Sequence, residues 1–280
     1  MRGYSRFTVV VRNTRPQKNA NLLRFGLLHV AALAVFVVPF DWTLVWWLVG
    51  SYFVRIFGIT AGYHRYFSHR SYKLGRGTQL LMAVLAQTSG QKSVLWWAAH
   101  HREHHRLADS PDDVHSPRHG FWWAHLGWIL STRYDAYEPR RVGDFGRYPE
   151  LRWLDRHHTA PTLAFGAAIW LAGGFAAFVW GYLLATVLLY HVTFAINSVA
   201  HVWGSRPYAT ADDSRNNALL ALLTFGEGWH NNHHCCRSSC RQGVRWWELD
   251  LTYLGLRALA AVGIARDLRP FVPYEGRRAA

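Results

Sequence analysis

The stretch WWAAHHREHH, residues 96–105, places four histidines within six positions. Three of them, His101, His104 and His105, have the spacing i, i+3, i+4, which puts their side chains on one face of a helix. Neutral imidazoles that converge on one face are typical ligands of transition metals. The stretch therefore predicts a helix whose histidine face binds metal.

Two further histidine motifs accompany this helix. Near the other end of the chain, residues 230–234 read HNNHH and repeat the spacing with His230, His233 and His234. His64 and His69 precede both motifs. Residues at i and i+5 lie about 140° apart on a straight α-helix. If these two histidines share a metal, the helix must end or bend between them.

Asn197 and His201 form another candidate pair, one helical turn apart at the end of an apolar run. A zinc site takes four ligands, so nine histidines imply two metals rather than one. Imidazole suits zinc, copper, iron and nickel, so the residue types alone leave the metal open. The nine candidate ligands are His64, His69, His101, His104, His105, His201, His230, His233 and His234.

Composition favours a membrane protein. Half of the 280 residues are hydrophobic, 15 are tryptophan, and the net charge is +14. Long apolar runs with this charge fit a membrane protein with a basic cytoplasmic face better than a nucleic-acid-binding protein, so we expect no nucleic-acid partner. Cys235, Cys236 and Cys240 are odd in number, which indicates a reducing compartment rather than a disulfide framework. They lack the CxxC spacing that is usual for zinc sites.

Four apolar segments, each close to 20 residues, are long enough to cross a hydrocarbon core of about 30 Å. A short turn at 39–41 separates the first two, and no cleavable signal peptide precedes them. The second segment contains Arg55, which we expect to face protein rather than lipid. The other two share a stretch of 47 residues, 159–205, without Asp, Glu, Lys or Arg, and we place their turn near 173–181. The predicted spans are 21–40, 42–62, 161–177 and 179–200.

Basic residues define the predicted topology. Segments 1–24, 63–160 and 204–280 contain 30 of the 31 lysines and arginines. By the positive-inside rule, both termini and the parts 1–20, 63–160 and 201–280 are cytoplasmic. Residues 79–87 are apolar but too short to span, so we expect them to dip beneath the metal site. The prediction is an all-α integral membrane protein, a single domain over 1–280, with four transmembrane helices and a cytoplasmic helical cap that carries a histidine-box di-metal site.

At these motifs the sequence resembles the membrane fatty acyl desaturases of the stearoyl-CoA desaturase type, over roughly residues 45–270. The resemblance implies a di-iron site that uses the nine histidines, with Asn197 acting through a water. The chain departs from the animal proteins at His100, where they have an acidic residue, and at 235–240 (CCRSSC). The segment WWELD (246–250) resembles the bacterial branch. The matching motifs are GITAGYHRYFSH (58–69), HREHH (101–105), NSVAH (197–201) and GEGWHNNHH (226–234).

The resemblance also implies an activity and its partners. The expected reaction introduces a cis double bond, at the delta-9 position, into a saturated acyl chain with dioxygen and two external electrons. Acyl-CoA is the expected substrate, and a bacterial inner membrane the expected location. The chain has no flavin, haem or iron–sulfur signature, so a ferredoxin or small cytochrome with a reductase must supply the electrons.

Four positions are carried over as substrate contacts. Gln91, Trp97 and Thr193 match residues that shape the bend of the acyl channel, and Tyr52 matches its closed end. Ordinary aromatic packing and buried hydrogen bonding are the alternative interpretations of these residues.

Two other functions remain open from the sequence. A lipid hydroxylase or other oxygenase can use the same histidine boxes, and a non-catalytic membrane protein can bind metal. Transport is disfavoured because only His29 and His191 lie within predicted spans, and two isolated residues make a poor pathway.

Overall fold

The computed structural model describes residues 15–273, and within this range every regular element is a helix. The first is α1 (Arg15–Ala32), which tightens into the 3-10 turn η1 (Leu33–Phe36). Asp41 then starts α2 (Trp42–Phe57), because its side chain accepts a hydrogen bond from the Thr43 N–H at 2.7 Å. Cytoplasmic placement of both chain ends was predicted, but residues 1–14 and 274–280 lie outside the described part of the chain.

The first apolar helix ends earlier than predicted, at Phe36 instead of residue 40. Pro39 follows, and the residue before a proline is driven away from helical geometry. Two helical stretches in the described chain are long and apolar enough to cross a membrane, Trp42–Ser68 and Ala160–His201, whereas Ala20–Phe36 is shorter.

The stretch Ala160–His201 folds back on itself at Gly174, whose φ of 71° favours glycine. Thr162 and Tyr182 consequently meet, with their hydroxyl oxygens 3.1 Å apart. The turn lies at the early edge of the predicted window, so the second arm begins before residue 179. The elements of this stretch are α8 (Ala160–Phe178), the π-helix η7 (Val179–Leu184), α9 (Ala185–Ser198) and the 3-10 turn η8 (Val199–His201).

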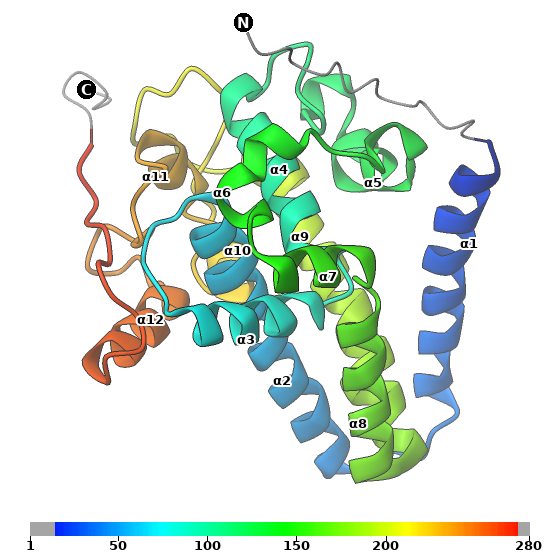
Figure 1. Cartoon of the computed structure of the whole chain (residues 1–280). Helices are drawn as coiled ribbons and strands as arrows, with labels where there is room; N and C mark the ends of the chain where they lie inside the picture. The colour runs from blue at the N-terminus through cyan, green and yellow to red at the C-terminus, as the bar shows by residue number, and fades with distance from the viewer. Residues whose placement is uncertain (1–14, 274–280) are drawn as a thin grey trace, which may run out of the picture.

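Helices α1, α2 and α8 extend together toward one end of the molecule, and most of the shorter helices gather at the other end (Figure 1). A histidine chain attaches α1 to α9. His29 Nε2 lies 3.0 Å from His191 Nε2, and His191 Nδ1 lies 3.1 Å from His125 Nε2. The two histidines that seemed isolated in the sequence are therefore partners.

The shorter elements connect the bundle to the histidine motifs. Those before α8 are α3 (Arg76–Gln87), α4 (Val94–Leu107), η3 (Pro117–His119), η4 (Trp123–Gly127), α5 (Trp128–Leu130), η5 (Thr132–Tyr134), η6 (Pro139–Val142), α6 (Gly143–Gly146) and α7 (Pro149–Arg156). Those after α9 are α10 (Ala218–Leu223), α11 (His230–Cys235) and α12 (Leu251–Ala261).

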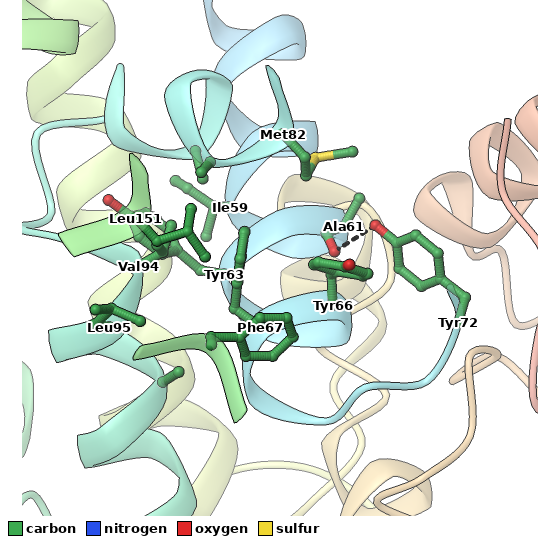
Figure 2. Close-up of a cluster of buried hydrophobic side chains, with 14 of the residues drawn as sticks. Ile59, Ala61, Tyr63, Tyr66, Phe67, Tyr72, Met82, Val94, Leu95 and Leu151 are labelled. Atoms are coloured by element: carbon green, nitrogen blue, oxygen red, sulfur yellow. Dashed lines mark hydrogen bonds between the residues drawn. The ribbon is translucent and has the colours of Figure 1, made fainter. Parts of the chain in front are cut away.

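The largest apolar core surrounds the π-helix η2 (Gly58–Ser68), which continues α2 and contains the first histidine motif. Figure 2 shows its side chains Tyr63 and Phe67 packed against residues of α3, α4 and α7. Tyr72 donates a hydrogen bond to the Ala61 carbonyl at 2.9 Å, drawn as a dashed line in Figure 2. Burial of one such aromatic side chain contributes about 1.5–3 kcal/mol. The segment that carries His64 is therefore anchored in the largest apolar core of the described chain.

Candidate metal centre

The nine candidate histidines form two separate clusters. In each cluster, one ligand atom per residue lies within 4.8 Å of all the others. Cluster A consists of His64, His69, His101, His105 and His233, and cluster B of His104, His201, His230 and His234.

Helix α4 confirms the helical prediction for residues 96–105 and also explains why there are two clusters. On a helix, His105 lies about 40° to one side of His101, and His104 about 60° to the other side. His101 and His105 consequently enter cluster A, while His104 enters cluster B. The motif on α11 divides in the opposite sense, with one histidine in cluster A and two in cluster B. One histidine face on each helix thus serves both clusters.

The π-helix brings His64 and His69 together. In this geometry the His69 N–H donates to the His64 carbonyl, five residues back, at 3.1 Å. Their ring centroids lie 4.7 Å apart. The helix also ends at Ser68, as the sequence required, but the wider turn is what places both rings on one side.

Imidazole nitrogens in cluster A approach one another in series. The Nε2 atoms of His69, His101, His105, His233 and His64, taken in that order, are separated by 2.8, 3.0, 2.9 and 3.1 Å. Metal–nitrogen bonds of about 2.0–2.1 Å at right angles would separate neighbouring ligand nitrogens by about 3.0 Å. Each nitrogen carries at most one proton, so hydrogen bonds cannot satisfy all four contacts. The spacing therefore fits a shared cation.

Carboxylates hold several of the histidines from behind. In cluster B, His104, His201 and His234 each direct Nδ1 at an aspartate, at 3.0, 2.8 and 2.9 Å. In cluster A, His64 Nδ1 contacts Glu227. An Nδ1–H donated to a carboxylate leaves the Nε2 lone pair free to bind metal. The aspartates of His104, His201 and His234 are Asp113, Asp109 and Asp212, respectively.

Two ring nitrogens of cluster B also indicate a metal site. His104 Nε2 and His234 Nε2 are buried and have no hydrogen-bond partner in the described chain. Because a buried polar atom without a partner costs free energy, a ligand for these lone pairs is expected. The donor set of both clusters therefore fits a pair of transition-metal ions.

Burial and mutual proximity favour the neutral, metal-binding form of three histidines in cluster A. Burial first, and then the neighbouring histidines, hold the pKa of His101, His105 and His233 well below the usual range. The carboxylates respond in the opposite way. Burial alone would raise the pKa of Asp113, but the facing His104 holds it below the usual range. Near neutral pH, these three imidazoles are therefore neutral and Asp113 is ionised, whereas the facing carboxylate of Asp113 raises the pKa of His104 despite its burial.

The sequence analysis missed these carboxylates and one histidine. His115 stacks on His104, with ring centroids 4.2 Å apart, and burial lowers its pKa to about 3. The segment DSPDDVH (109–115) contains Asp109, Asp113 and His115 in a short space directly after α4. That clustering of ligand-type residues was the available signal. The three cysteines, in contrast, are buried, and none belongs to a metal-type group in the described chain.

A cavity of about 410 Å³ reaches cluster A at His101 and exposes mostly apolar surface. Three of the predicted substrate residues lie together in the wall of this cavity. Gln91 Nε2 donates to Thr193 Oγ1 at 3.2 Å, and Trp97 Nε1 donates to Gln91 Oε1 at 3.4 Å. Trp97 also stacks on His101 of cluster A, with ring centroids 4.7 Å apart. Asn197 lines the same cavity, as do His100 and His115.

Tyr52 is not brought into this cavity. Its hydroxyl donates to the Leu223 carbonyl of α10 at 2.7 Å, and its ring packs against the core around η2. The proposed role at the closed end of the channel followed from the resemblance, but here the side chain connects two helices. The cavity is lined instead by other residues, among them Thr162, Tyr182 and Thr186.

We expect Tyr52→Ala to leave the chain length of the product unchanged. The loss of one hydrogen bond and of ring packing should instead lower the free energy of unfolding by about 2–5 kcal/mol. Gas chromatography of the extracted lipids measures the product. A shift toward longer chains would return Tyr52 to the substrate channel.

Fold and site together define a helical membrane protein with two histidine clusters beside an apolar cavity. A model of the fatty acid desaturase family matches residues 40–267. The chain is 37% identical over 276 residues to the icosanoyl-CoA 5-desaturase of Limnanthes douglasii, covering 95% of this chain and 76% of that protein. It is 34% identical over 269 residues to the sn-1 stearoyl-lipid 9-desaturase of Anabaena variabilis, covering 93% and 97%.

A third relative, a chloroplastic palmitoyl-monogalactosyldiacylglycerol delta-7 desaturase of Arabidopsis thaliana, is 39% identical over 243 residues and covers 85% of this chain and 65% of that protein. The chain therefore belongs to the fatty acid desaturase family, and it is an oxidoreductase that acts on fatty acyl chains. The named relatives differ in the position of the double bond and in the carrier of the acyl chain.

Proposed function

We propose that this protein introduces a cis double bond at the delta-9 position of a saturated long-chain acyl group. The observation that carries the proposal is the pair of histidine clusters together with an apolar cavity, which is lined by Trp97, whose ring stacks on His101 of cluster A. The proposed metals are two irons, one at each cluster. All nine histidines would be ligands, and Asn197 would act through a water.

Iron at the two clusters would supply the oxidising power, so that dioxygen, two electrons and two protons, together with two hydrogens of the acyl chain, yield two waters and an alkene. The protein's own residues prepare this reaction. The carboxylates Asp109, Asp113, Asp212 and Glu227 fix the orientation of four histidines. The apolar cavity wall excludes water and holds one pair of methylenes beside cluster A.

Gln91, Trp97 and Thr193 would determine how the chain bends there. The three side chains form a hydrogen-bonded group in the cavity, next to His101. An acyl chain that passes them must follow their surface, because the indole of Trp97 is fixed by stacking on Tyr63 and His101. A bent chain at the point of oxidation would yield the cis product.

Acyl-CoA is the proposed substrate. Arg24, Lys92 and His158 line the cavity and also a second, more polar cavity of about 380 Å³. Asp135 and Asp155 also line the second cavity, and Asp135 pairs with Lys92, so Arg24 and His158 are the groups proposed to meet the phosphates of a coenzyme A carrier. The stearoyl-lipid relative from Anabaena variabilis supports delta-9, whereas the Limnanthes relative acts on a CoA ester at another position.

The proposed placement is a bacterial inner membrane, with four spans formed by α1 and η1, α2 with the first part of η2 (to residue 62), α8, and η7 with α9. Residues 63–160 and 201–280 would form the cytoplasmic cap, on the side where the lysines and arginines concentrate. Exposed apolar side chains on the bundle support lipid contact, including Phe36 (83% exposed) and Leu171 (86%). A ferredoxin or small cytochrome with its reductase would deliver electrons from the cytoplasm.

Expression in a host that lacks such an enzyme tests the reaction. We expect one new cis-monounsaturated fatty acid, with its double bond located by mass spectrometry of derivatised lipids. A hydroxylated lipid would instead identify a di-iron hydroxylase with the same histidine boxes. A bond at carbon 5 or 7 would retain desaturation and exclude the delta-9 assignment.

The purified protein should contain close to two irons per chain, because the nine histidines form two clusters rather than one. Elemental analysis after expression in iron-replete medium measures this ratio. A chelator that removes the iron should abolish activity, and ferrous iron should restore it. One zinc and no iron would contradict the proposed centre.

A further inference from the structure

Residues 88–92 form a short loop between α3 and α4 that supplies part of the cavity wall. Gly90, Gln91 and Lys92 of this loop line the cavity. Gly90 and Lys92 have positive φ angles, 74° and 65°, so the loop has a tightly specified backbone path. Gln91, between them, belongs to the group of residues beside His101.

Three donors from three different helical elements form hydrogen bonds to alternate carbonyls of this loop. Arg55 of α2 donates to the Thr88 carbonyl through Nε at 3.1 Å and Nη2 at 2.9 Å. The Tyr190 hydroxyl of α9 donates to the Gly90 carbonyl at 2.9 Å. The Tyr63 hydroxyl of η2 donates to the Lys92 carbonyl at 2.6 Å. Side chains of α2, α9 and η2 therefore fix the position of the loop.

Arg55 is unusual among these donors because its side chain is fully buried and contacts no carboxylate in the described chain. Its guanidinium lies over the rings of Phe165 and Tyr182, and Nη1 has no hydrogen-bond partner. Burial of a charge without an opposite charge is costly, so its other contacts must fix the side chain closely.

Arg55 also connects the loop to another part of the cavity wall. Its Nη2 donates to Thr186 Oγ1 at 2.8 Å, and Thr186 lines the cavity. The guanidinium of Arg55 therefore contacts both the loop that carries Gln91 and the start of α9 at Thr186. Movement of Arg55 would change the spacing of these two walls.

We infer that Arg55, assisted by Tyr190 and Tyr63, fixes the depth of the acyl chain relative to the histidine clusters, and thereby selects the carbon–carbon bond that is oxidised. The inference rests on the proposed function, because it requires the acyl chain to occupy this cavity. The loop residues Gln91 and Lys92 contact the cavity beside cluster A, so a shifted loop presents a neighbouring pair of methylenes to His101. Misplacement by about 1 Å is enough to change which bond reacts, since reaction rates depend steeply on geometry.

Substitution of Arg55 and Tyr190 in the full-length, membrane-embedded enzyme tests this role. Arg55→Lys keeps the charge but loses the fork of donors, Arg55→Met loses both, and Tyr190→Phe removes one hydroxyl. Tyr72→Phe is the matched control, because it removes a buried hydroxyl that donates to a carbonyl outside the loop, that of Ala61. The readout is the double-bond position in lipids from cells with equal amounts of each protein.

We expect a single position for the wild type and for Tyr72→Phe. In Arg55→Lys and Arg55→Met a second positional isomer should reach about a tenth of the product or more, with a smaller share in Tyr190→Phe, because hydrogen bonds to charged groups are the stronger ones. Lower yields at an unchanged position in all three variants would overturn the inference and leave Arg55 a purely structural residue. If the arginine variants do not accumulate, the result for Tyr190→Phe decides. A wild type without any desaturated product would instead refute the proposed function, and this inference with it.

Discussion

His101→Ala should lower desaturation by at least about 100-fold and reduce the iron content, because it removes a member of cluster A. The Nε2 atom of His101 lies 2.8 Å from that of His69 and 3.0 Å from that of His105. Loss of the His101 imidazole therefore leaves a ligand position open in the proposed coordination sphere. Iron analysis and product yield, measured on the same purified protein, give the answer.

His100→Ala is the matched control on the same helix. His100 packs on Trp96 with ring centroids 4.6 Å apart, and belongs to neither cluster. This variant should keep both irons and much of the activity. Equal iron loss in both variants would mean that the helical phase does not distinguish a ligand from its neighbour.

Asp113→Asn and Glu227→Gln should each weaken one metal site selectively. Asp113 contacts His104 of cluster B, and Glu227 contacts His64 of cluster A. Loss of a carboxylate behind a ligating histidine typically costs 10–100-fold in metal affinity, because the imidazole loses its fixed tautomer and orientation. Titration with a chelator should therefore release about one iron per chain early from each variant, and two only from the double variant.

Asp144→Asn provides the control for these two variants, since this carboxylate pairs with Arg102 and not with a histidine. It should retain iron as the wild type does. Simultaneous loss of both irons from Asp113→Asn would argue against two independent clusters.

The nine histidines singled out in the sequence come together in the structure, and the fixed angular step of the α-helix explains part of this result. In α4, the positions of His101, His104 and His105 follow from that step alone. The apolar runs likewise predicted a helical bundle, since a membrane admits few alternatives. Gln91, Trp97 and Thr193 were found through resemblance, and the structure brings all three together.

What the sequence could not provide depends on local geometry and on distant contacts. In the π-helix around His64, hydrogen bonds join residues five apart instead of four apart as in an α-helix. No residue type specifies this geometry in advance. The chain reverses at Gly174, but the same apolar stretch also contains Gly173 and Gly181, so the sequence did not determine which glycine forms the turn. Asp212 lies 22 positions from His234, and only the folded chain joins them.

The carboxylates behind the histidines have a consequence for charge balance. Asp109, Asp113, Asp212 and Glu227 bring four negative charges to nine imidazoles, which bind metal in the neutral form. Arg65 contacts both Glu227 and Asp250, and the negative charge of Asp250 balances its positive charge. Two dications would make the buried assembly electroneutral, which is the condition under which ions are least costly to bury. Trivalent ions would leave excess positive charge, and monovalent ions excess negative charge. The protein should therefore load ferrous iron in preference to ferric iron, and the valence of its metals is determined by four side chains that never touch them.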